Sequence, residues 1–555
     1  MVRLKLILFF LLFLWLSLKP LQAEWAERGM VASEHGLASE AGVEMLKKGG
    51  NAVDAAVATS FALGVVNPSS CGIGGGGFML IHLAQQGKTY ALDYREKAPA
   101  AAFRDLFVKD GKADTHLSQK GPLAVAVPGE VAGLTTALQR FGTLPLPVVM
   151  EPAIRYAREG FAVGPHLAKQ ITRNADRIRQ RPALAAIFLK PDGTPYGEGE
   201  RLVWSDLATT LEAISQRGSE VFYRGELARA LVRTLEQEGG LITASDLTAY
   251  KPVWRQALTG RFQGYTVLTM PPPSGGGVLL EMLNILSRDR LKDLGPASPT
   301  YLHLLTETMK HAFADRAEYY GDPAFIPIPL HALLSSSYAR RMRHRISAVH
   351  TQAQEEYGRA ALSRDGGTSH LSVVDAQGNA VACTTTINTP FGSMVVAEGT
   401  GVILNNEMDD FSIQPGIANA FGLIGTEANA IAPGKKPLSS MTPTIVLKQN
   451  HPFLVLGGSG GPLITSATLQ VLLNVLSFGL DAVPAVALPR IHHQWAPDML
   501  FVEAGFPQEV RNSLERQGHV IKEFSAASAV QVVLVTPQGL QGAADPRKGG
   551  KAVGW

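Results

Sequence analysis

Apolar residues recur at two different spacings, and the spacing changes about two thirds of the way along the chain. Before residue 350, apolar residues three to four positions apart predict amphipathic helices, for example over 37–50 and 225–240. Further helices are expected over 51–66, where the apolar run suits a buried helix, and over 300–320. From residue 368 the alternation typical of β-strands dominates, over 368–375, 380–388, 401–405, 443–449, 453–458, 498–503 and 530–536. A helix is predicted over 462–479. The pattern indicates an α+β fold.

A polar connector separates these two parts. Residues 351–367, "TQAQEEYGRAALSRDGG", lack apolar periodicity and end in Asp-Gly-Gly, as exposed loops do. The part that follows has too few helices to cover both faces of its own sheet. We therefore expect the two parts to form one structural body.

The N-terminus has the anatomy of a secretory signal peptide. Arg3 and Lys5 precede an apolar core over 6–18, and Ala23 provides a small residue for cleavage. The core is too short for a comfortable membrane span. Residues 1–23 are therefore predicted to be removed on export, which leaves a periplasmic or extracellular protein without a stable membrane span.

Composition narrows the functional classes. The net charge of +3 on 555 residues gives no sign of a nucleic-acid partner. Only two cysteines are present, Cys71 and Cys383, so an exported chain of this length is no disulfide scaffold, and both are expected to be buried. Neither HExxH nor CxxC occurs, and no metal site is predicted.

Two glycine-rich segments resemble known motifs, one a dinucleotide-binding loop and the other a loop that carries a catalytic serine. "GIGGGG" at 72–77 satisfies GxGxxG, but a predicted helix precedes it and a strand follows, which disfavours dinucleotide binding. "GGSGG" at 457–461 lies between a strand and a helix and would suit Ser459 as an esterase nucleophile, with Asp481 and His492 or His493 downstream. The same loop could instead use its backbone N–H groups as an oxyanion hole.

A third segment, "GGTSHLSVVD", begins a strand with three residues that carry reactive groups. Ser369 and His370 are strand neighbours and should point to opposite faces, so they form no local pair. Cleavage between Gly367 and Thr368 would give Thr368 a free α-amino group with a pKa near neutrality. One residue would then supply both nucleophile and base.

Many ordered segments make the chain similar to the γ-glutamyltranspeptidases, also called glutathione hydrolases, of the N-terminal nucleophile hydrolase superfamily. They are "GGNAVDAAVA", "GIGGGGFML", "LDYREKAP", "VPGEVAG", "PPPSGGG", "TSHLSVVD", "LNNEMDDFS", "KPLSSMTPT", "PRIHHQW" and "GAADPR". The resemblance implies a four-layer αββα sandwich, formed jointly by a large subunit (24–367) and a small subunit (368–555) of one self-cleaved precursor. It also implies transfer of γ-glutamyl groups from small donors such as glutathione to water, amino acids or dipeptides, without metal or organic cofactor.

The resemblance also implies roles for individual residues. Thr368 would be the nucleophile of self-cleavage after Gly367 and of catalysis, and Thr386 would orient it. Gly460 and Gly461 would form the oxyanion hole. The remaining positions would bind the donor, with Arg95, Ser439 and Ser440 on its α-carboxylate and Asn388, Glu407 and Asp410 on its α-ammonium group.

Two features qualify this assignment. Pro462-Leu463 stands where many family members have Ser-Arg, which bears on acceptor contacts and rate. Residues 411–425 resemble a lid loop, with Phe421 as its gating aromatic residue, which favours small donors. The alternatives are a glutaryl-type β-lactam acylase of the same superfamily, a serine esterase using Ser459, and a processed but inactive binding protein.

Overall fold

The computed structural model describes residues 23–357, 367–524 and 528–555. These residues form two seven-stranded sheets in which all neighbouring strands are antiparallel. The first sheet has the order β1 (Glu24–Ala26), β22 (Gly539–Ala544), β21 (Ala529–Thr536), β17 (His451–Ser459), β16 (Thr444–Lys448), β11 (Tyr265–Thr269) and β10 (Leu258–Phe262). The second has the order β23 (Lys551–Gly554), β2 (Met30–Ser33), β12 (Ser369–Val374), β13 (Ala380–Thr386), β3 (Gly76–Leu83), β4 (Lys88–Tyr94) and β9 (Val253–Gln256).

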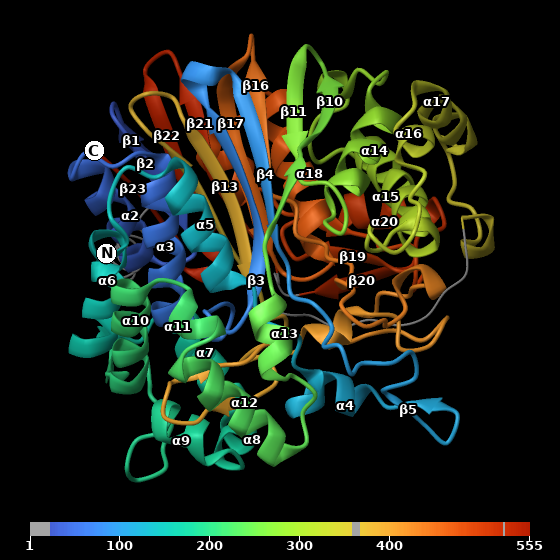
Figure 1. Cartoon of the computed structure of the whole chain (residues 1–555). Coiled ribbons are helices and arrows are strands. Elements are labelled where there is room, and N and C mark those ends of the chain that lie inside the picture. The colour runs from blue at the N-terminus through green and yellow to red at the C-terminus, as the bar shows by residue number, and fades with distance from the viewer. Residues whose placement is uncertain (1–22, 358–366, 525–527) are drawn as a thin grey trace, which may run out of the picture.

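Helices cover the outer face of each sheet, and the two inner faces pack against each other (Figure 1). The second sheet is covered by α2 (Gly36–Lys47), α3 (Ala52–Val66), α5 (Glu130–Phe141) and α6 (Leu146–Glu159). The first sheet is covered by α14 (Gly276–Leu286), α15 (Pro299–Tyr319), α18 (Leu463–Leu476) and α19 (Ala482–Ala487). The four-layer αββα sandwich expected from the sequence is confirmed.

Strand alternation decides which layer each side chain enters. In β17, Leu454 and Leu456 pack with the helices of the first sheet, whereas Val455 belongs to the core between the sheets. In β12, Leu371 and Val373 likewise pack against α3 and its neighbours. Both faces of these strands are therefore buried, because each sheet is covered on both sides.

The helices predicted over 37–50, 51–66, 300–320 and 462–479 correspond to α2, α3, α15 and α18. Asn51 caps α3, since its side chain accepts from the backbone N–H groups of Val53 and Asp54 while Asp54 accepts from the Asn51 N–H. The strands predicted after residue 368 are all present, the shortest being β15, Val402–Ile403. Six strands of the two large sheets were missed: β1, β2, β9, β10, β22 and β23.

The strands before and after residue 367 are interleaved in both sheets. In the second sheet, β2 lies between β23 and β12, so a strand from the N-terminal part is paired on both sides by strands from the C-terminal part. In the first sheet, β16 pairs with β11, which belongs to the N-terminal part. The two parts form one body, as the sequence predicts.

Cys71 and Cys383 are both buried and unpaired. The Tyr94 hydroxyl lies 3.0 Å from the Cys383 sulfur. Among the described residues, no helix combines the length and apolar character that a membrane crossing requires. The predicted signal peptide, apart from its last residue, lies outside the described residues.

Candidate active site

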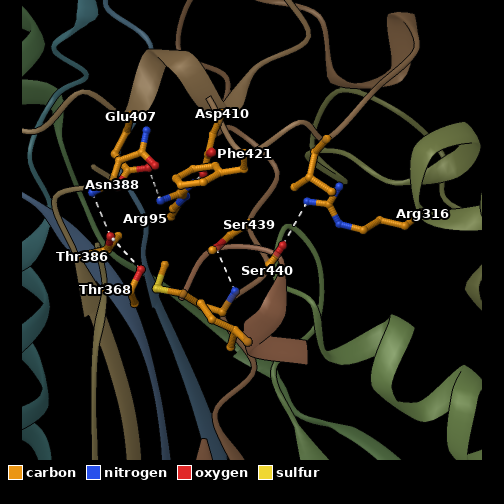
Figure 2. Close-up of a pocket in the computed structure, with 14 residues that line it drawn as sticks. Arg95, Arg316, Thr368, Thr386, Asn388, Glu407, Asp410, Phe421, Ser439 and Ser440 are labelled. Carbon is orange, nitrogen blue, oxygen red and sulfur yellow. Dashed lines mark hydrogen bonds and ion pairs between the residues drawn. The ribbon is translucent and has the colours of Figure 1, made fainter. Parts of the chain in front are cut away.

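Thr368 lies immediately before β12 and is 95% buried, with 5% of its surface exposed. Its hydroxyl donates to the carbonyl oxygen of Gly367 at 2.8 Å. Thr386, at the end of the adjacent strand β13, donates to the same oxygen at 2.9 Å and lies 3.3 Å from the Thr368 hydroxyl (Figure 2). The Thr386 oxygen also accepts the Asn388 backbone N–H at 2.8 Å. That N–H occupies a lone pair of Thr386, which leaves the Thr386 proton directed at the Gly367 carbonyl.

Gly367 is held in place from the opposite side by backbone contacts. Its N–H donates to the Asn388 carbonyl at 2.8 Å. Asn388 has a φ of 77°, in the left-handed region that asparagine tolerates better than most residues. A Cβ on Gly367 would lie 3.0 Å from the Ser69 carbonyl oxygen. The peptide bond before Thr368 therefore lies in a close-fitting backbone cradle.

Ser369 and His370 point to opposite faces of the strand, as predicted. The Ser369 hydroxyl accepts from the Asn67 amide at 3.0 Å, on the side of α3. His370 enters the core between the sheets, where Nδ1 lies 2.7 Å from the Thr384 hydroxyl. Burial lowers the pKa of His370 to about 3, so the ring is neutral. Both residues hold β12 in place and neither lines the pocket of Thr368.

Glycines end the strand that faces Thr368. Strand β17 ends at Ser459, and Gly460 and Gly461 follow with φ values of 120° and 58°, which side chains rarely adopt. Helix α18 begins two residues later, after Pro462. Gly461 lines the same pocket as Thr368. The loop therefore places glycine backbone at the N-terminus of a helix, beside a hydroxyl group.

A buried ion-pair network forms the far side of this pocket. Arg95 Nη1 lies 2.5 Å from Glu407 Oε2, and Arg95 Nη2 pairs with Asp410. Glu96, the neighbour of Arg95 in the sequence, is equally buried, so these two residues do not form an exposed ion pair. Arg95, Glu407 and Asp410, which the sequence assigns to opposite ends of a donor, thus contact one another (Figure 2).

Burial shifts the pKa values of the residues in this network. Burial raises the pKa of Glu407 well above its usual range although Arg95 opposes the shift, and the pKa of Asp410 is raised in the same way. Burial alone would lower the pKa of Arg95, but Glu407, Asp410 and Glu96 outweigh it and raise it. Glu407 Oε1 has no hydrogen-bond partner among the described residues. The network therefore keeps one acceptor free.

Ser439 and Ser440 line the opposite wall with an arginine that sequence reasoning missed. Arg316 of α15 reaches the pocket, and its Nη2 donates to the Ser440 hydroxyl at 3.4 Å (Figure 2). Burial lowers the pKa of Arg316 to about 10, and its Nε has no partner in the described part of the chain. Helical periodicity alone does not distinguish Arg316 from exposed arginines, which is why the sequence did not reveal it.

Residues 411–425, which the sequence predicts to be a lid loop, place Phe421 against the glycine loop. Phe421 is buried, and a Cβ on Gly461 would come within 2.9 Å of its ring. The Ala420 N–H donates to Asp409 Oδ2 at 2.8 Å, and Gln494 donates to the Gly422 carbonyl at 3.1 Å. The aromatic ring that the sequence assigns to the lid thus contacts the glycine loop directly.

The serine triad considered as an alternative is not assembled. Ser459 is buried, with its oxygen 2.8 Å from Lys548 Nζ. His492 Nδ1 lies 2.8 Å from the Ser466 hydroxyl, and Asp481 accepts from Gln541 at 3.2 Å. His493 interacts with Asp498 instead, at 3.2 Å. In addition, β17 is antiparallel to both neighbours, unlike the parallel sheet that carries a nucleophile elbow.

Lys548 is a second residue that the sequence did not reveal. Its Nζ lies 3.3 Å from the Thr368 carbonyl, in addition to its contact with Ser459, and 3.8 Å from Glu34. Burial raises the pKa of Glu34 although Lys548 opposes the shift. Lys548 therefore joins the strand that begins at Thr368 to the strand that leads into the glycine loop.

Known proteins resemble the chain over most of its length. A family model described as gamma-glutamyltranspeptidase matches residues 38–555. The chain is 44% identical over 528 residues to the glutathione hydrolase proenzyme of Escherichia coli (strain K12), which covers 94% of this chain and 91% of the relative. It is 38% identical over 559 residues to that of Bacillus subtilis (strain 168), with 96% and 92% covered.

Solved structures agree. A cephalosporin acylase from Bacillus halodurans superposes with a TM-score of 0.85 at 31% identity, covering 97% of this chain and 98% of that one. The Helicobacter pylori gamma-glutamyltranspeptidase superposes with a TM-score of 0.56 at 38% identity, covering 60% and 93%. With a family model spanning nearly the whole chain and close relatives of full length, the chain belongs to the γ-glutamyltranspeptidase family.

Proposed function

We propose that the protein is an exported, self-processing γ-glutamyltransferase and glutathione hydrolase. The observation that carries the proposal is a hydroxyl nucleophile, Thr368, in contact with the preceding carbonyl and facing a pocket of balanced charge. The names of the relatives, glutathione hydrolase proenzymes, support both the activity and the processing.

Maturation would begin at the Gly367 carbonyl. The Thr368 oxygen attacks the carbonyl carbon while the Thr386 proton stabilises the charge that develops on the carbonyl oxygen. The C–N bond breaks, Thr368 nitrogen takes a proton, and Gly367 is left as an ester on the Thr368 side chain. Water then hydrolyses the ester, which frees the hydroxyl and leaves a carboxylate on Gly367. The large subunit would end at Gly367 and the small subunit would begin at Thr368.

Turnover would reuse the same oxygen. The free α-amine of Thr368 takes the hydroxyl proton, and the oxygen attacks the γ-carbonyl of the donor to give a tetrahedral intermediate. The backbone N–H groups of Gly460 and Gly461 stabilise its oxyanion. The leaving amine departs with a proton, and the acyl-enzyme passes the γ-glutamyl group to water or to the amine of an acceptor amino acid or dipeptide.

When the donor binds, Arg95, Glu407 and Asp410 would pair with the charged groups of the donor instead of with one another. A glutamyl α-carboxylate replaces the acids around Arg95, and its α-ammonium group meets Glu407, Asp410 and the Asn388 side chain. The exchange conserves charge inside the pocket, so no buried ion loses its counter-ion. The free oxygen of Glu407 is one acceptor available to that ammonium group. Ser439 and Ser440 add hydroxyl donors to the carboxylate, and Arg316 adds a second positive charge through Ser440.

The lid favours a small donor. Phe421 rests on Gly461 and limits the space above the nucleophile, which suits glutathione better than a polymer. Pro462 and Leu463 begin α18 directly after the glycines and supply neither a hydroxyl nor a charge there. Acceptor recognition next to the loop would therefore depend on shape more than on ion pairing.

One preparation tests the proposal. Mature protein purified from the periplasm or medium should give two fragments on a denaturing gel, one with the N-terminal sequence TSHLSVV. Thr368→Ala should give a single chain that releases no γ-glutamyl group. Cleavage that persists in this variant would refute the role of Thr368.

Donor choice separates the enzyme from its rivals. The mature protein should hydrolyse glutathione and should not hydrolyse a glutaryl amide, which lacks the α-ammonium group that Glu407 and Asp410 would bind. Faster turnover of the glutaryl amide would favour the acylase alternative. Ester hydrolysis that disappears in Ser459→Ala but persists in Thr368→Ala would favour the esterase.

A further inference from the structure

Three side chains of metal-binding type meet in a buried cluster that the proposed reaction does not use. His303 and Glu307 lie one turn apart on α15, and His519 lies between α20 (Gln508–Arg516) and β20 (Ile521–Phe524). One ligand atom from each lies within 4.8 Å of the other two. None of the three lines the pocket of Thr368. Sequence spacing gives no hint of the cluster, because His303 and His519 are 216 residues apart.

The hydrogen bonds of the two imidazole rings resemble those of metal-binding histidines. His303 Nε2 lies 2.9 Å from the Ser347 carbonyl oxygen, and a carbonyl can only accept, so Nε2 carries the proton. With that proton on Nε2, the other ring nitrogen, His303 Nδ1, is free to accept and lies 2.7 Å from His519 Nε2. Ligating histidines commonly anchor their other nitrogen on a backbone carbonyl in this way.

The third member supplies negative charge. Glu307 is fully buried, and its partners are the hydroxyls of Thr351, at 2.6 Å, and Tyr357. No ion pair of Glu307 exists within the described residues, whereas Lys310, the nearest lysine along the same helix, is 2.8 Å from Asp498. A buried carboxyl group close to two imidazole rings is the donor set of a divalent cation such as Zn²⁺.

We propose that His303, Glu307 and His519 bind one Zn²⁺ ion, with water in the fourth position. Donor atoms around tetrahedral zinc lie ~3.3 Å apart, so the two imidazole nitrogens would separate by a few tenths of an ångström and Glu307 would approach them. The proton on His519 Nε2 would move to Nδ1, so that the ring stays neutral and Nε2 offers its lone pair.

The position of the site gives it a structural role. Ser347, Thr351 and Tyr357, which contact His303 and Glu307, belong to the segment that leads to residue 358. The Thr351 N–H also donates to the Gln517 carbonyl at 2.8 Å. A zinc ion would therefore tie the end of the large subunit to His519 of the small subunit. This last point depends on the proposed cleavage, whereas zinc binding itself does not.

Metal retention tests the site independently of catalysis. Tag-free full-length protein, incubated with Zn²⁺ and dialysed against zinc-free buffer, should retain about one equivalent by mass spectrometry of the metal. His303→Gln and His519→Gln should lose it, while His331→Gln, at an exposed position on α16 (Leu330–Leu333), should retain it. Equal retention in all four proteins, or none in the wild type, overturns the proposal.

Crystals of the wild-type protein soaked with Zn²⁺ provide a second measurement that needs no variant. Anomalous scattering at the zinc edge should place one ion between His303, Glu307 and His519. An ion found only elsewhere overturns the assignment even if a variant fails to fold. Normal γ-glutamyl transfer by a zinc-free protein would leave the proposed function intact, so the two proposals fail separately.

Discussion

At the scale of single residues, the proton of Thr386 is the most specific element of the proposed processing step. Its oxygen already accepts from Asn388, so its hydrogen has the Gly367 carbonyl as its target. Thr386→Val keeps the shape and removes that donor. We expect processing to slow by about 100-fold, the effect typical of one lost oxyanion donor.

The rate is measured by following the appearance of the two fragments on denaturing gels. Thr306→Val is the matched control, since Thr306 is equally buried but donates to the Leu302 carbonyl on α15, away from Thr368. Equal processing rates in the wild type and in Thr386→Val would remove Thr386 from the mechanism.

Arg95 holds a buried ion-pair network together, and we propose that it also binds the donor. Arg95→Gln would leave Glu407 and Asp410 without their cation, and breaking a buried pair costs about 3–5 kcal/mol in the free energy of unfolding. The KM for glutathione should rise by about 10- to 100-fold through loss of charge-assisted hydrogen bonds. Arg255→Gln is the control, because Arg255 pairs with a different acid, Asp93, at 2.7 Å. An unchanged KM in Arg95→Gln would exclude the residue from the donor site.

Residue-scale prediction from sequence had a clear limit. The position of Thr368 before a strand, Gly461 after one and the acids at 407 and 410 could be assigned by resemblance, and the pocket gathers all of them. Arg316 and Lys548 could not, because each reaches the site from an element that is distant in sequence. A single charged residue on a helix or in a turn carries no local signal of where its side chain ends.

At the scale of elements, one short helix serves two functions. The 3-10 helix η5 (Glu407–Asp410) presents Glu407 and Asp410 to Arg95 and Asp409 to the lid. Asp409 accepts from Ser118 and from the Ala420 N–H. Any shift of this helix on donor binding would therefore reach the lid directly.

Asp409 should make stability depend on pH in a direction unusual for an aspartate. Burial raises its pKa to about 6, above the ordinary value near 3.8, so the folded state prefers the protonated form. Its contribution therefore stabilises the protein as the pH falls from about 6 to about 4, and that stabilisation is lost as the pH rises. Asp409→Asn removes this contribution.

The comparison is best made in the Thr368→Ala background, where a single chain unfolds. Urea unfolding should show that the difference in free energy between Asp and Asn at position 409 changes in favour of Asp toward pH ~4.5. A difference that is the same at pH ~4.5 and ~7 would contradict the assigned shift. Other titrating groups are common to both proteins and cancel.

Element prediction succeeded for the long helices. Helices α3 and α15 extend over four or more turns and were placed within one or two residues. Strands β22 and β23, "GLQGAA" and "KAVG", were missed because small residues and glycines are also typical of turns. They become strands because neighbouring strands supply their hydrogen bonds.

At the scale of the whole molecule, the two sheets meet closely at Gly457. A Cβ on this residue would lie 2.3 Å from the His370 ring, which is buried and cannot retreat. Gly457→Ala should lower the free energy of unfolding by about 1–3 kcal/mol or more through overpacking, and should slow processing because β12 carries Thr368. Gly36→Ala is the control, since its Cβ would meet only a flexible Lys551 side chain at 3.3 Å. Wild-type stability in Gly457→Ala would show that the sheets can separate locally.

The order of the strands could not be read from the sequence. Nothing local to "MVAS" (Met30–Ser33) specifies that it pairs with a strand more than 300 residues away on one side and with the C-terminus on the other. The layer arrangement followed from the family resemblance. The pairing follows from which apolar faces remain exposed once the hairpins have formed, a property of the assembled chain.

The interleaved strands indicate that the peptide bond at 367–368 is needed while the chain folds and not afterwards. Before cleavage, that bond makes the search for partner strands intramolecular, which the long-range pairings of both sheets need. Once β2 is fixed between β23 and β12, the bond no longer contributes to holding the parts together. Subunits synthesised as two separate chains would have to find each other with unpaired strand edges exposed to aggregation. Under the proposed cleavage, the chain would be continuous while it folds and would be divided only afterwards, when Thr368 needs its free α-amino group.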